Sequence, residues 1–225
     1  MTRLAALIPV KQLRSAKQRL SGLLDPAERH ELALSMLQDV IALVKSTSIV
    51  TDVLVASGDP EVLRFAERSG LETFIPACDL DLNSTLNLSA KRLAAEKCDR
   101  ILILPTDIPL AMPEDLRTLV ATHLERGDHL TVATARKDFG TNGLVMAPPA
   151  SIPVCFGTLS GLRHVESAQE HGLNAHALSV PGLDLDIDEP ADIDQFLKKA
   201  RTGTTWSYLM HIRLPERLAF KGREE

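Results

Sequence analysis

Acidic residues that could bind a metal ion occur in two separate segments of the sequence. Asp184, Asp186 and Asp188 alternate with apolar residues in the run LDLDIDEP. If this run is a strand, the three carboxylates share one face, and such crowding is costly unless a cation neutralises the charges. Carboxylate oxygens are hard ligands that favour Mg²⁺ or Mn²⁺. The alternative is structural: Asp188 caps a helix opened by Pro190, and Asp184 lies in an exposed turn.

The second acidic segment is PTDIPL, in which Asp107 stands between two prolines after the apolar run Ile101–Leu104. Few backbone conformations are open to such a residue, which favours a metal ligand over a surface charge. A turn-capping Asp is the alternative. In an open parallel sheet, ligands bind outside the carboxyl ends of the strands. We therefore expect Asp107 to converge with the other acidic segment on one metal site.

A basic segment follows the first apolar run of the chain. The sequence KQLRSAKQR, residues 11–19, holds four cations and no acid. An acidic protein that handles phosphates needs either a local basic loop or bound divalent cations, and this segment supplies the former. The alternative is an ordinary solvated loop.

An alternation of β-rich and helical runs must position these segments. The expected strands are Leu4–Val10, Val53–Ala56, Leu71–Ile75, Ile101–Leu104, Leu130–Ala135, Gly143–Ala147 and Ala175–Val180. One expected helix begins at Asp25-Pro26-Ala27-Glu28, and a second runs from Asp59 to Gly70. The other four cover Ser84–Glu96, the span from Pro113 to Gly127, Leu159–Glu170 and Pro190–Ala200. This order predicts a single α/β/α sandwich with a mostly parallel central sheet.

Length and composition agree with one domain and one tail. The chain has 225 residues, of which 44% are hydrophobic and 24% charged, as in an ordinary globular protein. We predict the domain over residues 1–200. The tail, residues 201–225, holds the only Trp (Trp206) and the only Tyr (Tyr208). Three interpretations of this tail stay open: it packs on the domain, lies at the interface of a homodimer, or is a partly ordered terminus.

Charge, hydropathy and missing motifs exclude several function classes. A net charge of −5 argues against a general nucleic-acid binder, and the apolar runs are too short for a membrane span. The N-terminal stretch does not predict a signal peptide, so we expect a cytoplasmic protein. Cys78, Cys98 and Cys155 are too few and too scattered for a zinc site or a disulfide framework. The sequence also lacks a GxxxxGK[ST] phosphate loop, a GxGxxG fingerprint, an HExxH pair and a GxSxG elbow.

Six short segments carry a resemblance to one enzyme family. In chain order they are Ile8–Leu20, Asp79–Asn83 with Leu86, Pro105–Leu110, Asp138–Leu144, Phe156–Ser160 with His164, and Asp184–Ile193. Together they resemble the guanylyltransferases of deazaflavin coenzyme (F-420) biosynthesis, which are related to the molybdenum-cofactor and sugar-phosphate nucleotidyltransferases. The resemblance implies a sandwich of the nucleotidyltransferase (GT-A-like) type. Phe139 departs from the family, which more often has Gly there, and we expect this to alter the acceptor pocket.

The resemblance also implies a reaction and a role for each matching residue. The reaction is transfer of GMP from GTP to the phosphate of 2-phospho-L-lactate, phosphoenolpyruvate or 3-phospho-D-glycerate, with release of pyrophosphate. The implied metal ligands are Asp107, Asp186 and Asp188, and the implied nucleotide contacts are Lys11, Lys17, Arg19 and Asn83. The implied acceptor contacts are Thr141, Gly157 and Ser160, with Asp184, Asn142 and His164 in support.

The residue inventory suits this reaction because the nucleophile is a phosphate oxygen that is already anionic at neutral pH. No catalytic nucleophile or general base is therefore expected among the side chains, and Mg²⁺ with Lys and Arg would relieve the repulsion between the reactants. Three alternatives stay open: a molybdenum-cofactor-type or other nucleotidyltransferase, a glycosyltransferase with an Asp-x-Asp metal motif, and a nucleotide-binding regulatory protein without turnover.

Overall fold

The computed structural model describes residues 2–76 and 80–221, so Cys78 and Asp79 lie outside the described part. Seven strands form one sheet in the order β3-β2-β1-β4-β6-β5-β7. The strands are β1 (Leu4–Val10), β2 (Asp52–Ser57), β3 (Glu72–Phe74), β4 (Arg100–Ile103), β5 (Leu130–Thr134), β6 (Thr141–Met146) and β7 (Ala175–Leu178). β6 pairs antiparallel with β4 and β5, and the other pairings are parallel. The predicted mostly parallel sheet is therefore confirmed.

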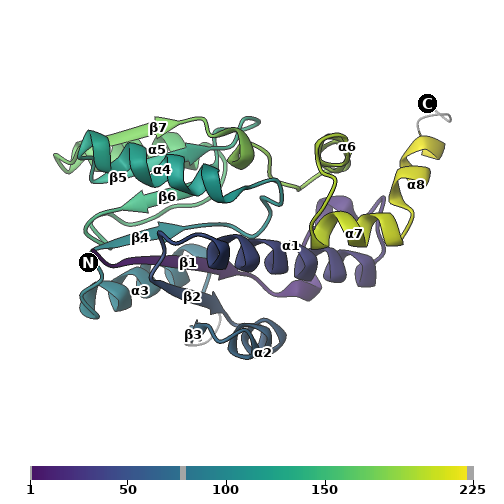
Figure 1. The fold of residues 1–225 in the computed structure, drawn as a ribbon, viewed down its shortest axis with the longest axis horizontal. Helices are drawn as coiled ribbons and strands as arrows, with labels where there is room; N and C mark the ends of the chain where they lie inside the picture. The colour runs from purple at the N-terminus through teal and green to yellow at the C-terminus, as the bar shows by residue number, and fades with distance from the viewer. Residues whose placement is uncertain (1, 77–79, 222–225) are drawn as a thin grey trace.

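Helices cover both faces of this sheet (Figure 1). The helices are α1 (Pro26–Ser46), α2 (Pro60–Arg68), α3 (Leu82–Ala95), α4 (Pro113–Arg126), α5 (Ser160–Glu170), α6 (Pro190–Lys199), α7 (Thr204–His211) and α8 (Leu214–Lys221). One apolar cluster joins α1, α2 and α4 to the sheet, and another joins α3 and α5 to its opposite face. None of the described helices has the length and hydropathy to cross a membrane.

The first strand shows why the sheet is central. Every residue of β1 is buried, and its side chains alternate between the two faces. Ile8 belongs to the α1 side and Leu7 to the α3 side. A strand buried on both faces is typical of a parallel sheet with helices on either side. β1 ends at Val10, at the carboxyl edge of the sheet, and the basic segment of residues 11–19 follows it directly.

Local capping signals fix the helix starts. Asp25 and Glu28 form a capping box at α1, with Glu28 N–H donating to Asp25 Oδ1 at 2.8 Å and Asp25 N–H donating to Glu28 Oε2 at 3.0 Å. Several predicted boundaries shift by one or two residues, and two starts lie two residues earlier than predicted. α3 begins at Leu82 and not at Ser84, because Asp81 accepts from the Ser84 N–H at 2.7 Å and caps the helix. β6 begins at Thr141, two residues before the predicted start.

The acidic run is not a strand, so the condition under which its three carboxylates would share one face is not met. A short 3₁₀ turn, η3 (Pro181–Leu183), leads into residues 184–188, which pair with no strand in the described part of the chain. Burial still alternates, with Leu185 and Ile187 inside and the aspartates half-buried. The Ile187 N–H donates to the Asp107 carbonyl at 2.9 Å, and this bond replaces a ladder. The premise of a strand fails, but one edge of the run remains acidic.

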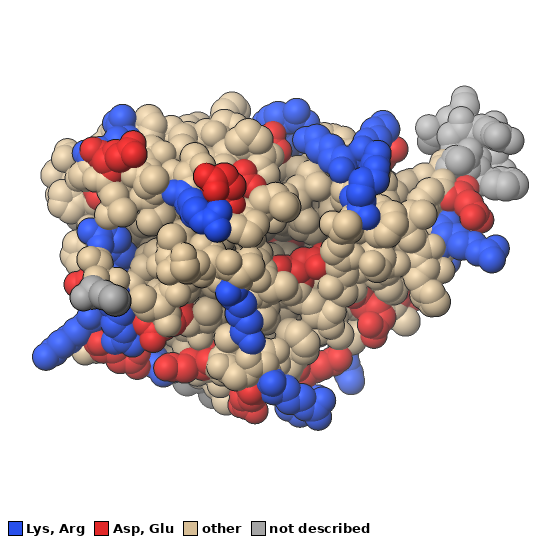
Figure 2. Space-filling model, viewed as in Figure 1, with Lys and Arg blue, Asp and Glu red and all other residues tan. Residues whose placement is uncertain are grey.

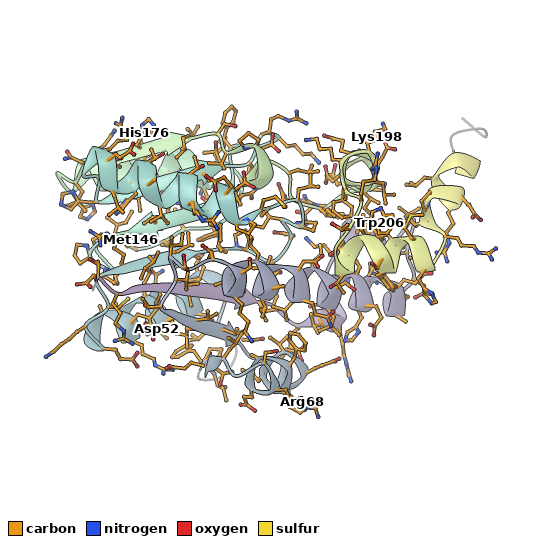
Figure 3. The ribbon with its side chains drawn as sticks, in the orientation of Figure 1. Asp52, Arg68, Met146, His176, Lys198 and Trp206 are labelled. Atoms are coloured by element: carbon orange, nitrogen blue, oxygen red, sulfur yellow. The ribbon has the colours of Figure 1, made fainter. Side chains whose placement is uncertain are left out.

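The C-terminal segment forms two helices beyond the expected six. α7 packs against α1, and Asp39 of α1 accepts from the N–H groups of Thr204 (2.6 Å) and Thr205 (2.8 Å) at the start of α7. Leu209 and Leu214 are fully buried in a third apolar cluster with α1 and α6. Trp206, labelled in Figure 3, packs against that cluster. The domain boundary at residue 200 stays a prediction.

Candidate active site

Two adjoining clefts open where β1, β2 and β4 end at the sheet edge. The large cleft has a volume of about 850 Å³ and extends from the end of β2 to the start of α3. The small cleft has a volume of about 470 Å³ and reaches Asp107 and the start of β6. Lys11, Phe156 and Gly157 line both clefts, so the two spaces share one boundary. Figure 2 shows acidic and basic side chains interspersed over much of the visible face.

The three side chains predicted as metal ligands come together in the small cleft. One oxygen each of Asp107, Asp186 and Asp188 lies within 4.8 Å of the others, and all three residues are half-buried. We call this set the carboxylate cluster. Within residues 2–76 and 80–221, it is the one group of three or more ligating side chains close enough to share an ion. The expected convergence of two acidic segments distant in the sequence is thus observed.

A lysine from the basic segment bridges two members of the carboxylate cluster. Lys17 Nζ lies 2.7 Å from Asp107 Oδ2 and 2.7 Å from Asp188 Oδ1, and its side chain is only 10% exposed. The Lys17 backbone is left-handed, with φ at +53° between two short 3₁₀ turns, η1 (Leu13–Ser15) and η2 (Gln18–Leu20). Arg19 is more exposed, 3.8 Å from Asp188 and Glu189. The basic segment therefore folds back onto the acidic one.

Burial and charge crowding shift the pKa values of the carboxylate cluster. Burial raises the pKa of Asp186 to about 6, and repulsion from Asp107 adds to this rise. Burial also disfavours the charged Asp188, but the Lys17 ammonium outweighs it and holds the pKa of Asp188 below its usual range. The same pairing keeps the pKa of Lys17 above its usual range despite burial. One lysine thus pairs with two of the carboxylates, whereas Asp186 forms no salt bridge with any residue that the structure describes.

Neighbouring side chains hold the acidic run in place. Buried Asn142 of β6 donates to the Leu183 carbonyl at 2.8 Å and to Asp186 Oδ1 at 3.3 Å. Before the run, the Gly182 N–H donates to Asp115 Oδ1 at 3.2 Å, at the start of α4. A Cβ atom at Gly182 would lie 1.9 Å from the Asp115 carboxylate, so a larger residue there would force that carboxylate, which also accepts from the Met112 N–H, to move. The acidic run is therefore fixed from both the sheet and a helix start.

A second polar group lies beside the first and is buried, with Thr141 reaching the small cleft. Thr141 Oγ1 lies 2.9 Å from Ser160 Oγ and 3.0 Å from His164 Nδ1. The Cys155 N–H donates to His164 Nε2 at 2.8 Å, so Nε2 carries no proton and Nδ1–H donates to Thr141. Burial lowers the pKa of His164 to about 4, which keeps the ring neutral. We call Thr141, Ser160 and His164 the hydroxyl–histidine cluster.

The remaining predicted site residues lie at different distances from the clefts. Lys11 and Asn83 line the large cleft, and the Asn83 amide is also bonded to the Phe156 backbone. Gly157 has φ at +138°, a conformation that glycine adopts without strain. Ser160 is fully buried and meets the small cleft only through Thr141, which lines it. Asp184 lies outside the carboxylate cluster.

Two further residues stand out in the structure. Phe139, whose neighbours Asp138 and Gly140 line the small cleft, is 51% exposed and has φ at +53°, a backbone conformation that favours glycine. Asn87, one helical turn after Asn83, binds the Val154 backbone. The sequence offered a signal for Asn87, because two asparagines four residues apart share one helix face although asparagine is a weak helix former.

Comparisons with known proteins agree with this geometry. Residues 4–221 match the family model described as "Guanylyl transferase CofC like". The chain is 36% identical over 200 residues to a phosphoenolpyruvate guanylyltransferase of Sphaerobacter thermophilus, covering 89% of this chain and 95% of that protein. It is 34% identical over 208 residues to a 2-phospho-L-lactate guanylyltransferase of Methanothermobacter thermautotrophicus, covering 92% and 90%.

Solved structures share the fold at low sequence identity. A putative nucleotide-diphospho-sugar transferase from Desulfovibrio desulfuricans superposes with a TM-score of 0.77 at 16% identity, covering 96% of this chain and 99% of that one. A nucleotidyl transferase from Methanothermobacter thermautotrophicus superposes with a TM-score of 0.65 at 19% identity, covering 89% and 100%. The predicted nucleotidyltransferase-type sandwich is confirmed. With the family match over nearly the whole length, the chain belongs to the CofC-like guanylyl transferase family.

Proposed function

We propose that this chain transfers GMP from GTP to the phosphate of a small phosphorylated carboxylic acid and releases pyrophosphate. The observation that carries the proposal is the carboxylate cluster in a cleft that shares Lys11, Phe156 and Gly157 with a larger one. Transfer between two anionic reactants needs one space for each of them and cations where they meet. The two joined clefts and the acidic and basic segments between them support this assignment.

The carboxylate cluster suits a divalent metal ion. Its donors are hard oxygens that lie within 4.8 Å of one another, and within residues 2–76 and 80–221 Asp186 forms no salt bridge. Asp107, Asp186 and Asp188 would hold Mg²⁺ or Mn²⁺. When bound, such an ion supplies charge neutralisation for the phosphates and for the leaving pyrophosphate. With such an ion on the carboxylates, Lys17 would be available to bind phosphate oxygens.

The nucleotide occupies the large cleft in this proposal, with its phosphates directed toward the carboxylate cluster. The guanine and ribose have room in the volume of about 850 Å³. Lys11, Lys17 and Arg19 contact the phosphates, since all three line the small cleft and come from one loop. Asn83 lies at the side of the large cleft, near the boundary with the small one.

The phosphorylated acid occupies the small cleft. The Thr141 hydroxyl and the backbone N–H at Gly157 are the donors offered to its oxygens, because both residues line that space. Ser160 lies behind Thr141, away from the cleft, and its hydroxyl forms a hydrogen bond with the Thr141 hydroxyl. Asn142 supports the opposite side by holding Asp186. His164 fixes the direction of the hydroxyl bonds, since its Nδ1–H donates to Thr141.

The reaction proceeds without a protein nucleophile. An oxygen of the acceptor phosphate forms a bond to the α-phosphorus of GTP, and the bond from that phosphorus to the bridging oxygen of the β-phosphate breaks. Pyrophosphate leaves with the electron pair. The attacking oxygen is already anionic, so the protein contributes positioning and charge neutralisation and no proton transfer is required. One phosphoanhydride replaces another, so removal of pyrophosphate drives the reaction forward.

Three acceptors are to be compared: phosphoenolpyruvate, 2-phospho-L-lactate and 3-phospho-D-glycerate. The first two are the acceptors in the names of the relatives from Sphaerobacter and Methanothermobacter. The purified protein is assayed with each of four nucleoside triphosphates against each acceptor in Mg²⁺, with pyrophosphate release as the readout. We expect release with GTP and at least one acceptor.

The outcomes of this assay separate the alternatives. No pyrophosphate from GTP with any acceptor would contradict the proposal. Hydrolysis of a nucleotide sugar without pyrophosphate release would favour a glycosyltransferase. Tight GTP binding that is unaffected by Asp107→Asn, without turnover, would favour a regulatory protein, since the carboxylate cluster would then be dispensable.

A further inference from the structure

The segment Val154–Gly157 forms the boundary between the two clefts. Phe156 and Gly157 line both of them, while Val154 is buried in the core on the α3 side of the sheet. We call this segment the dividing segment. Any displacement of it changes the shape of both reactant spaces at once. Its position therefore bears on the alignment of the two reactants.

Side chains of α3 hold one side of the dividing segment. The Val154 N–H donates to Asn87 Oδ1 at 2.9 Å, and Asn87 Nδ2 donates to the Val154 carbonyl at 3.1 Å. Two residues later, the Phe156 N–H donates to Asn83 Oδ1 at 2.7 Å, and Asn83 Nδ2 donates to the Phe156 carbonyl at 3.3 Å. Each asparagine amide thus pairs with a backbone N–H and carbonyl, as a neighbouring strand would.

The spacing of the two asparagines explains why this pairing works. Residues four apart on a helix lie on one face with a rise of about 6 Å. Alternate residues of an extended chain are about 6.6 Å apart and direct their backbone groups to the same side. The spacing of the two side chains therefore matches that of the two backbone positions, so that Asn87 pairs with Val154 and Asn83 with Phe156. Asn87 Nδ2 also donates to the Asn83 carbonyl at 2.8 Å, which fixes the orientation of its amide.

The other side of the dividing segment is held by the hydroxyl–histidine cluster. The Cys155 N–H donates to His164 Nε2, and the His164 ring packs edge-on against Phe156 with centroids 5.5 Å apart. Because His164 Nδ1–H donates to Thr141, one histidine links the dividing segment to an acceptor contact. The segment is thus clamped between α3 and α5.

We propose that Asn87 is a positioning residue for the transfer: by holding Val154, it sets the dividing segment and so the alignment of the two reactants. Among the described residues, Asn87 lines neither cleft, so its effect passes through the dividing segment. The inference rests on the proposed function for the identity of the reactants. Small errors in alignment are expensive in a reaction that depends on positioning.

The test replaces Asn87 by leucine, which has nearly the same size but forms neither hydrogen bond. We expect Asn87→Leu to raise the KM for GTP and the KM for the acceptor together, each by about tenfold, the usual effect of one half-buried polar group left unpaired. A variant that only unfolds more easily lowers the concentration of active enzyme, so its kcat falls while both KM values stay constant. The paired rise thus separates positioning from stability.

The matched control is Asn174→Leu. Asn174 is an exposed asparagine at the opposite edge of the sheet, and its backbone bonds to His129 and Leu130 do not need its side chain. We expect both KM values of this control to equal those of the unsubstituted protein. Amide hydrogen exchange supplies a second readout: the peptide spanning 154–157 should exchange faster in Asn87→Leu and not in the control.

Unchanged KM values, a rise for only one reactant, or unchanged exchange in the dividing segment would overturn the inference. If the unsubstituted protein releases no pyrophosphate from GTP with any of the three acceptors, the proposed function is contradicted independently of Asn87. The inference about Asn87 is then decided by calorimetric GTP affinity together with exchange, and an unchanged affinity in Asn87→Leu would reject it.

Discussion

Two polar clusters meet at the start of β6, and they are built in opposite ways. Thr141 directs its hydroxyl into the hydroxyl–histidine cluster, while the next residue, Asn142, directs its amide into the carboxylate cluster. The first cluster is neutral, buried and hydrogen-bonded within itself. The second gathers three carboxylates around one lysine and leaves the pKa of Asp186 raised to about 6. The difference is that the groups of the first cluster are partnered by one another, whereas the carboxylates of the second share a single lysine.

That contrast follows from the energetics of buried groups. A buried polar group is stable when each donor and acceptor has a partner, as in the hydroxyl–histidine cluster. Crowded like charges lower the stability of the folded protein unless a cation is added. Natural proteins accept such a loss where function requires it. Substitutions in the two clusters should therefore differ in whether activity and stability change in the same direction.

The largest expected effect is that of Asp186→Asn. We expect turnover to fall at least about a thousandfold, because a metal that neutralises developing charge is worth several kcal/mol and each 1.4 kcal/mol is tenfold. Stability without metal should rise by about 1 kcal/mol after allowance for solvent screening, because a carboxylate with a raised pKa destabilises the folded state above pH 6. Steady-state kinetics and denaturant unfolding in EDTA measure the two effects.

Asp194→Asn is the matched control for that experiment. Asp194 is exposed on α6 and pairs with Lys198 one turn away, a surface ion pair of small energetic value. Neither turnover nor stability should change appreciably. Turnover of Asp186→Asn within a few-fold of the unsubstituted protein would show that the metal assignment is wrong.

Lys17→Met comes next in expected size. The kcat/KM for GTP should fall about a hundredfold, as for other cations that stabilise a transferring phosphoryl group. Mn²⁺ should bind more tightly in the absence of GTP, because the ammonium that occupies Asp107 and Asp188 is gone. Calorimetry measures the metal affinity, with exposed Lys198→Met as the control. An unchanged Mn²⁺ affinity would mean that Lys17 does not compete with the metal.

The two buried histidines sharpen the neutral side of the comparison. The pKa values of His164 and His123 are each lowered from 6.5 to about 4, mainly by burial. The unfolded chain binds these protons first, so stability should fall as pH decreases from 6.5 to 4, by about 1.4 kcal/mol per pH unit for each histidine. In denaturant unfolding, His164→Asn and His123→Asn should each remove the contribution of one histidine to this dependence of the unfolding free energy on pH.

Kinetics distinguish these two variants. His123, on α4, bonds Thr131 and lines neither cleft in the described part of the chain, so its replacement should leave both KM values unchanged. His164→Asn should raise the KM for the acceptor, since Thr141 and Cys155 lose their partner. Equal KM values in the two variants would place His164 outside the acceptor site.

The smallest expected effect is that of Phe139→Gly. Glycine removes the strain of φ at +53° but loosens the unfolded chain, so the net gain in stability should be below about 1 kcal/mol. We expect acceptor preference to change more than GTP affinity, because Asp138 and Gly140 line the small cleft. Arg213→Gly, at φ +54° between α7 and α8, is the control. Equal changes in acceptor preference and GTP affinity would contradict this assignment.

Much of the fold was predictable because its signals are local. Asp25 with Glu28, Asp59 before Pro60, and Gly127 at φ +63° mark helix ends by backbone chemistry that needs no distant partner. The meeting of Asp107 with Asp186 and Asp188 was also predictable, since a parallel sheet brings strand ends to one edge.

The parts that were not predicted depend on contacts between distant segments. The acidic run looks like a strand in the sequence, yet its hydrogen bond goes to the Asp107 carbonyl and not to a neighbouring strand. The pairing of Lys17 with two aspartates requires a left-handed backbone that nothing in its neighbours specifies. The two C-terminal helices depend on Asp39, 165 residues before Thr204, to cap α7.

Gly182 helps to position the carboxylate cluster although it lies outside it. Its N–H donates to Asp115, and a Cβ atom at Gly182 would lie 1.9 Å from that carboxylate. We expect an alanine there to displace the Asp115 carboxylate, to break the bond that ties η3 to the start of α4, and so to loosen the aspartates that follow. A random-mutagenesis screen for inactive alleles should therefore recover substitutions at this glycine as readily as substitutions of the acidic side chains, although it contacts no reactant.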